Sequence, residues 1–186
     1  MVAMRAGAFL CAILMTGGTF AQHQASVAGY AGENLDWGVP ATDSLRQEPY
    51  HAPTPLTIPG ASVVKTRELA AMLAGPNPPI LIDVLSGEGH VSLAGAVWIA
   101  GAGRGENFAD ALQAQLAPLL AQLSGGDKSK PLAFFCASAE CWLSYNTALR
   151  AVAAGYSRVY WYRGGIEAWT EAGLPTAKTI AGRKPS

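Results

Sequence analysis

Four short, uninterrupted apolar runs, alternating with segments of helical character, constrain the fold of this chain more than any other feature. The runs lie at residues 80–82, 97–99, 132–135 and 159–162. A continuous apolar run of this length indicates a strand buried on both faces, as in a parallel sheet. Alternating strands and helices place helices on both faces of such a sheet. The sequence therefore predicts one α/β domain over residues 61–177.

Four segments have the features of helices that would cover this sheet. Thr66 is predicted to cap the first helix, with Glu68 in the first turn near the positive end of the helix dipole. Pro118 is expected to kink or split the second helix. The segments are residues 66–74, 106–123, 142–154 and 165–172.

The first 21 residues have the parts of a secretory signal. A short basic start at residues 1–5 precedes an apolar stretch at residues 6–15, and small residues lead to Ala21. This stretch is shorter than the roughly 20 apolar residues that a membrane-spanning helix needs. We therefore expect export and removal of residues 1–21 by cleavage after Ala21.

Residues 22–60 are rich in glycine and proline and contain few apolar clusters. They are expected to form an irregular arm in which Trp37 and Tyr50 are suited to packing; a plain linker is the alternative. Residues 178–186 are expected to form a C-terminal tail.

The charge and residue spacing of the mature chain argue against several classes of ligand. Loss of Arg5 with the signal leaves 12 basic and 13 acidic residues, a balance with no electrostatic footprint for nucleic acid or a membrane surface. His23, His51 and His90 have no spacing that makes a metal site with the cysteines. The glycine-rich residues 101–105 lack the pattern of a dinucleotide site, so no cofactor is expected.

Two cysteines, Cys136 and Cys141, follow the third apolar run. A bridge between them would close only a short loop, and the entropic gain from a disulfide grows with loop length, so stapling of the fold is a poor rationale. Reactivity explains so close a pair better. Cys136 lies where a strand turns into the next helix, and this end of an open parallel sheet is where ligands bind.

The loop after Cys136 is suited to stabilising a thiolate. Its small residues can turn several backbone N–H groups inward, and the next helix contributes its positive N-terminus, so that the thiol pKa falls and Cys136 becomes a nucleophile. The alternative is a buried cysteine that acts as a small hydrophobe. The loop consists of Ala137, Ser138, Ala139 and Glu140, followed by Cys141 and Trp142.

Several segments resemble the sequence motifs of rhodanese domains, the closing motif most specifically. The resemblance implies a rhodanese fold, a five-stranded parallel sheet with helices on both faces. It also implies that Cys136 is the family's catalytic cysteine, which carries a persulfide sulfur. The segments that carry the resemblance are residues 81–84, 95–97, 155–156, 159–160, 164–169 and 172–175.

Residues 50–55, residues 101–105 and the pair Cys141 and Trp142 look like a narrower group, the rhodanese-related proteins associated with PQQ-dependent catabolism. That group is known for a double-cysteine-tryptophan (CXXCW) motif; here four residues separate the two cysteines. Membership implies a periplasmic location and an accessory role in PQQ-dependent alcohol oxidation. The implied partner is a quinoprotein dehydrogenase or its cytochrome, and direct PQQ binding is not predicted.

The loop departs from the sulfurtransferase pattern in its charge. Cys141 occupies the sixth position, where the family often has an arginine, and Glu140 is the only charged residue. A carboxylate that faces thiosulfate costs binding energy, so the sequence argues against thiosulfate turnover. Arg104 and Asp83 are the candidate substrate-binding residues, and Arg163 is expected to be solvated at the surface.

The sequence leaves three functions open. In the first, Cys136 forms a persulfide with a small sulfur donor or acceptor, and any enzymatic activity is of the rhodanese type. In the second, the protein is a thiol–disulfide redox protein in which Cys141 resolves the product on Cys136. In the third, the fold is a non-catalytic binding module. Cys141 is then a packing residue, and Trp142 is either core packing or an exposed docking contact.

Overall fold

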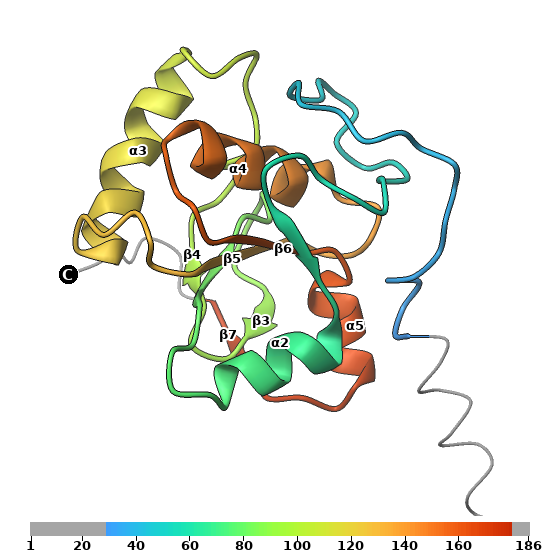
Figure 1. Cartoon of the computed structure of the whole chain (residues 1–186). Coiled ribbons are helices and arrows are strands. Elements are labelled where there is room, and N and C mark those ends of the chain that lie inside the picture. Colours follow the sequence, from blue (N-terminus) through green and yellow to red (C-terminus); the bar gives the residue numbers. More distant parts are fainter. Residues whose placement is uncertain (1–28, 180–186) are drawn as a thin grey trace, which may run out of the picture.

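A five-stranded parallel sheet forms the centre of the computed structural model, which describes residues 29–179 (Figure 1). The strand order is β1-β6-β5-β2-β4. This sheet confirms the predicted α/β class. The predicted signal and its cleavage site at Ala21 lie outside the described residues. The strands are β1 (Ser62–Val64), β2 (Ile80–Asp83), β4 (Val97–Trp98), β5 (Leu132–Phe135) and β6 (Val159–Tyr162).

All four apolar runs form strands of this sheet. β5 lies between β2 and β6 and is buried along its whole length. The register places Asp83 beside Phe135, so that β2 and β5 end together at the same edge. β4 is shorter than expected and ends at Trp98. The sequence did not predict β1, because its three residues are too short for a periodic signal; β1 forms by pairing with β6.

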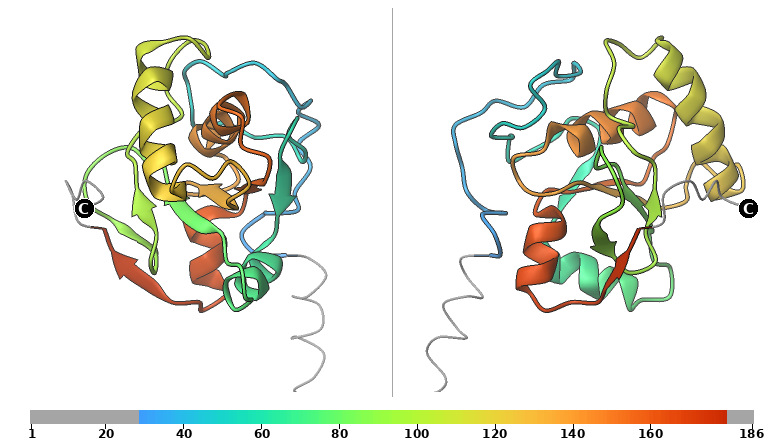
Figure 2. Two further views of the ribbon diagram at one scale, coloured as in Figure 1. Left: turned by 60° about the vertical axis from the view of Figure 1, so that its left-hand side comes forward. Right: turned by 180° about the vertical axis from the view of Figure 1, so that it is seen from behind.

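Within residues 29–179, four helices cover the sheet, two on each face (Figures 1 and 2). α3 and α4 pack on one face through Leu116, Leu120 and Leu149. α2 and α5 pack on the other through Leu69 and Trp169. The helices are α2 (Thr66–Leu73), α3 (Ala111–Ser124), α4 (Trp142–Ala153) and α5 (Gly165–Glu171).

α3 begins at Ala111 rather than at residue 106. Asp110 caps it by accepting a hydrogen bond of 2.8 Å from the N–H of Gln113, which ends the preceding loop at this point. Pro118 lies inside α3 without splitting it. A proline removes one helical hydrogen bond, and the burial of the α3 leucines offsets this loss.

α2 begins as predicted at Thr66, but Lys65 and not Thr66 occupies the capping position. The N–H of Lys65 donates to the carboxylate of Glu68 (2.9 Å). The hydroxyl of Thr66 donates instead to the carboxylate of Glu33 (2.7 Å), far away in the sequence. The Thr66 hydroxyl therefore binds Glu33, a tertiary partner, instead of capping the helix.

Residues 29–60 contain no helix or strand, and they pack against the domain (Figure 1). The hydroxyl of Tyr145 donates to the carbonyl oxygen of Thr42 (2.8 Å), and the N–H of Arg46 donates to the side chain of Asn146 (3.0 Å). Both partners belong to α4. Of the two expectations, a packed arm and a plain linker, the structure shows the packed arm.

An antiparallel pair of strands that the sequence did not predict lies beside the main sheet. β3 (Val91–Leu93) pairs with β7 (Thr176–Lys178). β7 includes the first residue of the segment expected to be a tail. In the part of the chain that the structure describes, no helix is both long and apolar enough to cross a membrane.

Candidate functional site

Cys136 and Cys141 are joined by a disulfide at the carboxyl end of β5, with their Cα atoms 6.1 Å apart. Cys136 is fully buried and Cys141 nearly so. Cys141 directly precedes α4. The structure therefore brings the two predicted catalytic residues together, and Cys141 does more than pack at the start of the helix.

Helix α5 holds the loop of residues 136–141 in place through two backbone hydrogen bonds. The N–H of Ile166 donates to the carbonyl oxygen of Cys136 (3.0 Å), and that of Glu167 donates to the carbonyl oxygen of Ala137 (2.9 Å). These bonds turn the two carbonyl oxygens toward α5. The N–H groups of the loop take no part in these bonds with α5.

Three consecutive N–H groups of the loop have no acceptor among residues 29–179: those of Ala137, Ser138 and Ala139. The next two are satisfied within the loop, since the N–H of Glu140 donates to the Ser138 hydroxyl (3.3 Å) and that of Cys141 to the Ser138 carbonyl (3.2 Å). Successive unpaired N–H groups next to a helix N-terminus attract negative charge. This part of the loop can stabilise a thiolate or a persulfide anion on Cys136, as the sequence predicts.

The arm lies across the loop and covers it. His51 and Cys141 form an antiparallel bridge, and the N–H of Ala52 donates to the carbonyl oxygen of Glu140 (2.9 Å). The hydroxyl of Thr54 donates to the carbonyl oxygen of Ala139 (2.5 Å). Residues 50–54 therefore limit the access of a reactant to the disulfide. Sequence reasoning missed this contact because the two segments lie about 90 residues apart in the chain.

Trp142 fixes the same part of the arm. Its side chain is 2% exposed. The indole N–H donates to the carbonyl oxygen of Pro53 (3.0 Å), and the backbone N–H donates to that of Tyr50 (2.9 Å). The guanidinium of Arg46 lies over the indole, 5.0 Å from its centre. Core packing is confirmed for Trp142, and an exposed docking contact is excluded.

Arg163 was expected at the surface, and that prediction is wrong. The side chain is 1% exposed, and burial lowers its pKa. Its guanidinium donates to the carbonyl oxygens of Glu33 (2.8 Å) and Leu35 (2.9 Å), and to the Thr54 hydroxyl (3.0 Å). It also stacks on Trp37, 4.8 Å from the ring centre. All these partners belong to the arm. Arg163 therefore fixes the arm over the loop, and its guanidinium is not free to bind an anion.

Asp83, a candidate substrate-binding residue, is fully buried at the end of β2. Its Oδ1 accepts a hydrogen bond from the N–H of Leu85 (2.9 Å). Its Oδ2 accepts one from the Ser92 hydroxyl (2.5 Å) and lies 2.7 Å from Nε2 of His90. These contacts engage both oxygens in fixing the segment after β2.

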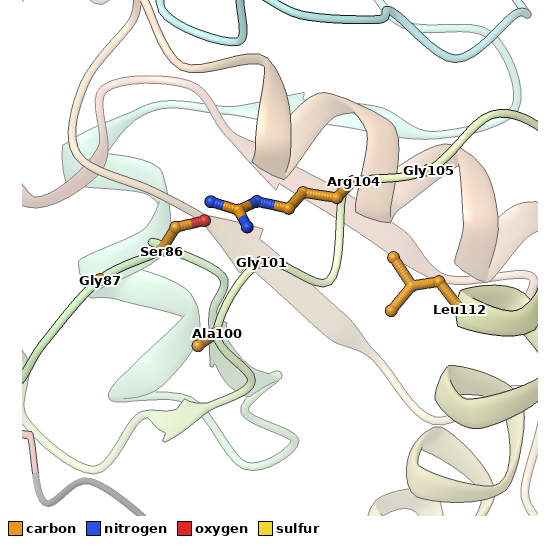
Figure 3. A pocket seen from close by; sticks show the side chains of 7 residues that line it. All are labelled: Ser86, Gly87, Ala100, Gly101, Arg104, Gly105 and Leu112. Atoms are coloured by element: carbon orange, nitrogen blue, oxygen red, sulfur yellow. The ribbon is translucent and has the colours of Figure 1, made fainter.

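Arg104, the other candidate, is exposed and lines a surface pocket of about 400 Å³ (Figure 3). The pocket lies after the ends of β2 and β4, whereas Cys136 follows β5. Neither cysteine lines it. The remaining residues that line the pocket are Ser86, Gly87, Ala100, Gly101, Gly105 and Leu112.

Among residues 29–179, no cluster of three or more histidine, cysteine or acidic side chains could hold a metal ion.

A family model of the rhodanese-like domain matches residues 65–172, more than half of the chain. The chain belongs to the rhodanese-like domain family. The matched range contains four of the five strands of the sheet, since β1 precedes it, and it includes the loop from Cys136 to Cys141. No curated protein matches the sequence.

The rhodanese-like domain is similar to several solved structures. The thiosulfate sulfurtransferase of Pseudomonas aeruginosa is 20% identical with a TM-score of 0.46; the match covers 63% of this chain and 20% of that one. The polysulfide-sulfur transferase homodimer of Wolinella succinogenes is 20% identical with a TM-score of 0.44, over 68% and 85% of the two chains. A rhodanese-like domain of Anabaena sp. is 21% identical with a TM-score of 0.44, over the same shares. This chain thus spans about a fifth of the Pseudomonas protein.

Proposed function

We propose that this protein transfers sulfur through a persulfide on Cys136, and that Cys141 forms the disulfide with Cys136 when no acceptor takes the sulfur. A sulfur-transfer role is supported at the level of the rhodanese-like family. The observation that carries the proposal is the Cys136–Cys141 disulfide itself, formed in a loop that presents unpaired N–H groups. Cys136 corresponds to the catalytic cysteine of the family, and Cys141 makes a resolving step possible.

The cycle begins with reduction of the disulfide by a dithiol, which supplies two electrons and two protons. The thiolate of Cys136 then attacks the terminal sulfur of a persulfide or polysulfide donor, takes that sulfur atom, and releases the donor as a thiolate. In the productive direction, an acceptor thiolate attacks the outer sulfur of the Cys136 persulfide and carries it away. Without an acceptor, the thiolate of Cys141 attacks the inner sulfur, releases hydrosulfide, and restores the disulfide.

Persulfides and polysulfides suit this site better than thiosulfate does. Glu140 is the only charged residue of the loop, and Arg163 is engaged by the arm. No loop cation offsets the repulsion between a carboxylate and the dianion. A donor that carries less charge at its reacting sulfur avoids this cost.

A thiol–disulfide exchange protein is the second candidate function, and the same disulfide favours it. In that case a partner's thiols reduce the Cys136–Cys141 disulfide, two electrons pass to it, and no sulfur atom is carried. Cys141→Ser separates the two functions, because it blocks the disulfide cycle and leaves Cys136 able to hold a persulfide.

The decisive experiment is intact-mass measurement of the reduced protein after incubation with polysulfide. Cys141→Ser is expected to gain one sulfur atom and keep it, whereas the wild type is expected to return to the disulfide and release hydrosulfide. Cys136→Ser, the matched control, should gain nothing. A disulfide that exchanges with dithiols while no variant gains sulfur would establish the redox function instead, and two unreactive thiols would leave only a binding module.

The setting that we propose is the periplasm, in support of PQQ-dependent alcohol oxidation, with a quinoprotein dehydrogenase or its cytochrome as partner. The signal-like residues 1–21 and the motif that contains Cys141 and Trp142 support this proposal. The mature protein should begin at Gln22 in a periplasmic fraction. Cells with Cys136→Ser should lose growth on an alcohol that requires such a dehydrogenase; unimpaired growth would remove this assignment.

A further inference from the structure

The pocket after the ends of β2 and β4 combines one cation with apolar surface. Among residues 29–179, Arg104 is the only charged residue that lines it and no acidic side chain does, while Ala100 and Leu112 contribute apolar atoms. A site with this composition favours a small organic anion. Taking the proposed function as given, we infer that this pocket binds the carboxylate end of a low-molecular-weight thiol or persulfide whose sulfur exchanges with Cys136.

Two groups in the pocket lack protein partners. The Oγ of Ser86 is buried and has no hydrogen-bond partner among residues 29–179, although buried hydroxyls in native proteins nearly always have one. The guanidinium of Arg104 likewise has no acceptor among these residues. Figure 3 shows the Ser86 hydroxyl and the Arg104 guanidinium pointing toward one another. A carboxylate between them would accept hydrogen bonds from both, and the guanidinium fork matches its two oxygens.

The backbone of Arg104 is held in place before any ligand arrives. Its N–H donates to the carbonyl oxygen of Gly101 (2.9 Å), and its carbonyl oxygen accepts from Nη2 of Arg150 (2.7 Å). Arg150 is fully buried and forms an ion pair with Asp110 (2.6 Å). The backbone at Arg104 therefore needs no ordering on binding, and this keeps the entropic cost low.

The distance to Cys136 sets the length of the ligand. The N–H of Val84 donates to the carbonyl oxygen of Phe135 (3.0 Å), and the N–H of Gly101 donates to that of Val84 (3.1 Å). Two successive strand spacings therefore separate Gly101 from the residue before Cys136, which is about 10 Å. Three extended residues span about that length. Once residues 50–54 move off the buried Cys136, a thiol of tripeptide size can place its carboxylate in the pocket and its sulfur at Cys136, whereas thiosulfate is too short to reach both.

Binding can be tested without sulfur chemistry in the Cys136→Ser protein, with the S-methylated tripeptide Cys-Gly-Gly as probe and calorimetry as the measurement. Arg104→Gln should weaken binding about tenfold, the loss of one hydrogen bond to a charged group, and Ser86→Ala should weaken it less. The probe with an amidated C-terminus should bind the parent protein about tenfold more weakly as well. Arg158→Gln removes the same charge at an exposed position before β6, and should have no effect.

A second measurement separates this inference from the proposed function. In the wild type, transfer of sulfur from Cys-Gly-Gly persulfide should show a raised KM in Arg104→Gln with kcat retained. Probe binding without any sulfur transfer would overturn the proposed function and leave the pocket as a carboxylate site. Equal affinity for the acid and the amide probe, or an unchanged KM in Arg104→Gln, would overturn the pocket assignment even if Cys136 transfers sulfur.

Discussion

Among single residues, Gly165 determines how closely α5 approaches the reactive loop. Its φ is +63°, and a Cβ at this position would lie 2.5 Å from the carbonyl oxygen of Cys136 and 2.7 Å from that of Ala137. Any side chain there would push the loop away from the helix that holds it. Gly173 has nearly the same φ, +68°, but a Cβ at that position would meet no neighbouring atom within 4 Å, so the chain contains its own control.

Gly165→Ala should therefore be more damaging than Gly173→Ala. Both substitutions carry the cost of a left-handed backbone, about 1–2 kcal/mol, but only Gly165→Ala adds overpacking, about 1–3 kcal/mol more. Urea denaturation of the oxidised proteins measures the difference in the free energy of unfolding. The displaced loop should also load sulfur more slowly. Equal destabilisation by the two substitutions would show that the loop yields without cost.

At the scale of elements, an ion pair between the buried Arg150 and the partly exposed Asp110 joins α3 to α4. Arg150 of α4 donates to both carboxylate oxygens of Asp110, the cap of α3, at 2.6 and 3.0 Å. The Arg150 guanidinium, and more weakly the N–H of Gln113, hold the pKa of Asp110 well below its usual range against the opposing effect of burial. The sequence could not predict this pairing, because the partner lies 40 residues away.

Asp110→Asn tests this pair, because asparagine caps a helix as well as aspartate does but cannot form the ion pair. At neutral pH the substitution should cost about 2 kcal/mol. The folded-state pKa lies below the unfolded value, so the pair stabilises fully above about pH 5 and less as the pH falls below about 4. The wild type should thus lose stability more steeply than the variant between pH 5 and 3 in urea titrations. Parallel curves would mean that the pair contributes no pH-dependent stability.

At the scale of the whole molecule, the arm is the part that covers the disulfide. Thr54 links the arm to both sides of the site, because its hydroxyl donates to the carbonyl oxygen of Ala139 and accepts from Nε of Arg163. The structure therefore has a closed form of the site. A reactant that is to reach Cys136 needs the segment at residues 50–54 to move.

Thr54→Val should speed up reduction of the disulfide by dithiothreitol. Loss of a hydrogen bond worth about 1.4 kcal/mol corresponds to a rate increase on the order of tenfold if opening of the arm limits the reaction. Alkylation and mass spectrometry over time measure the rate. Thr57→Val changes an exposed threonine of the same arm and should leave the rate unaltered; a similar rate in Thr54→Val would show that the arm does not control access.

What the sequence by itself determined is most of the central sheet and the position of the cysteine pair. Continuous apolar runs predicted β2, β5 and β6, and the small-residue loop after β5 identified Cys136 and Cys141 as the candidate pair. These features depend on neighbours in the chain, since burial on both faces and a turn into a helix have local residue patterns.

Only the tertiary structure decided how the site is closed and which residues line the pocket around Arg104. Arg163 contacts Thr54 across 109 residues of sequence, and Ser86 and Arg104 line one pocket because β2 and β4 are adjacent. An arginine that donates to backbone carbonyls leaves no pattern in the sequence, because any residue supplies a carbonyl. Such contacts follow from the path of the folded chain, so residue type alone could not separate a buried arginine from a solvated one.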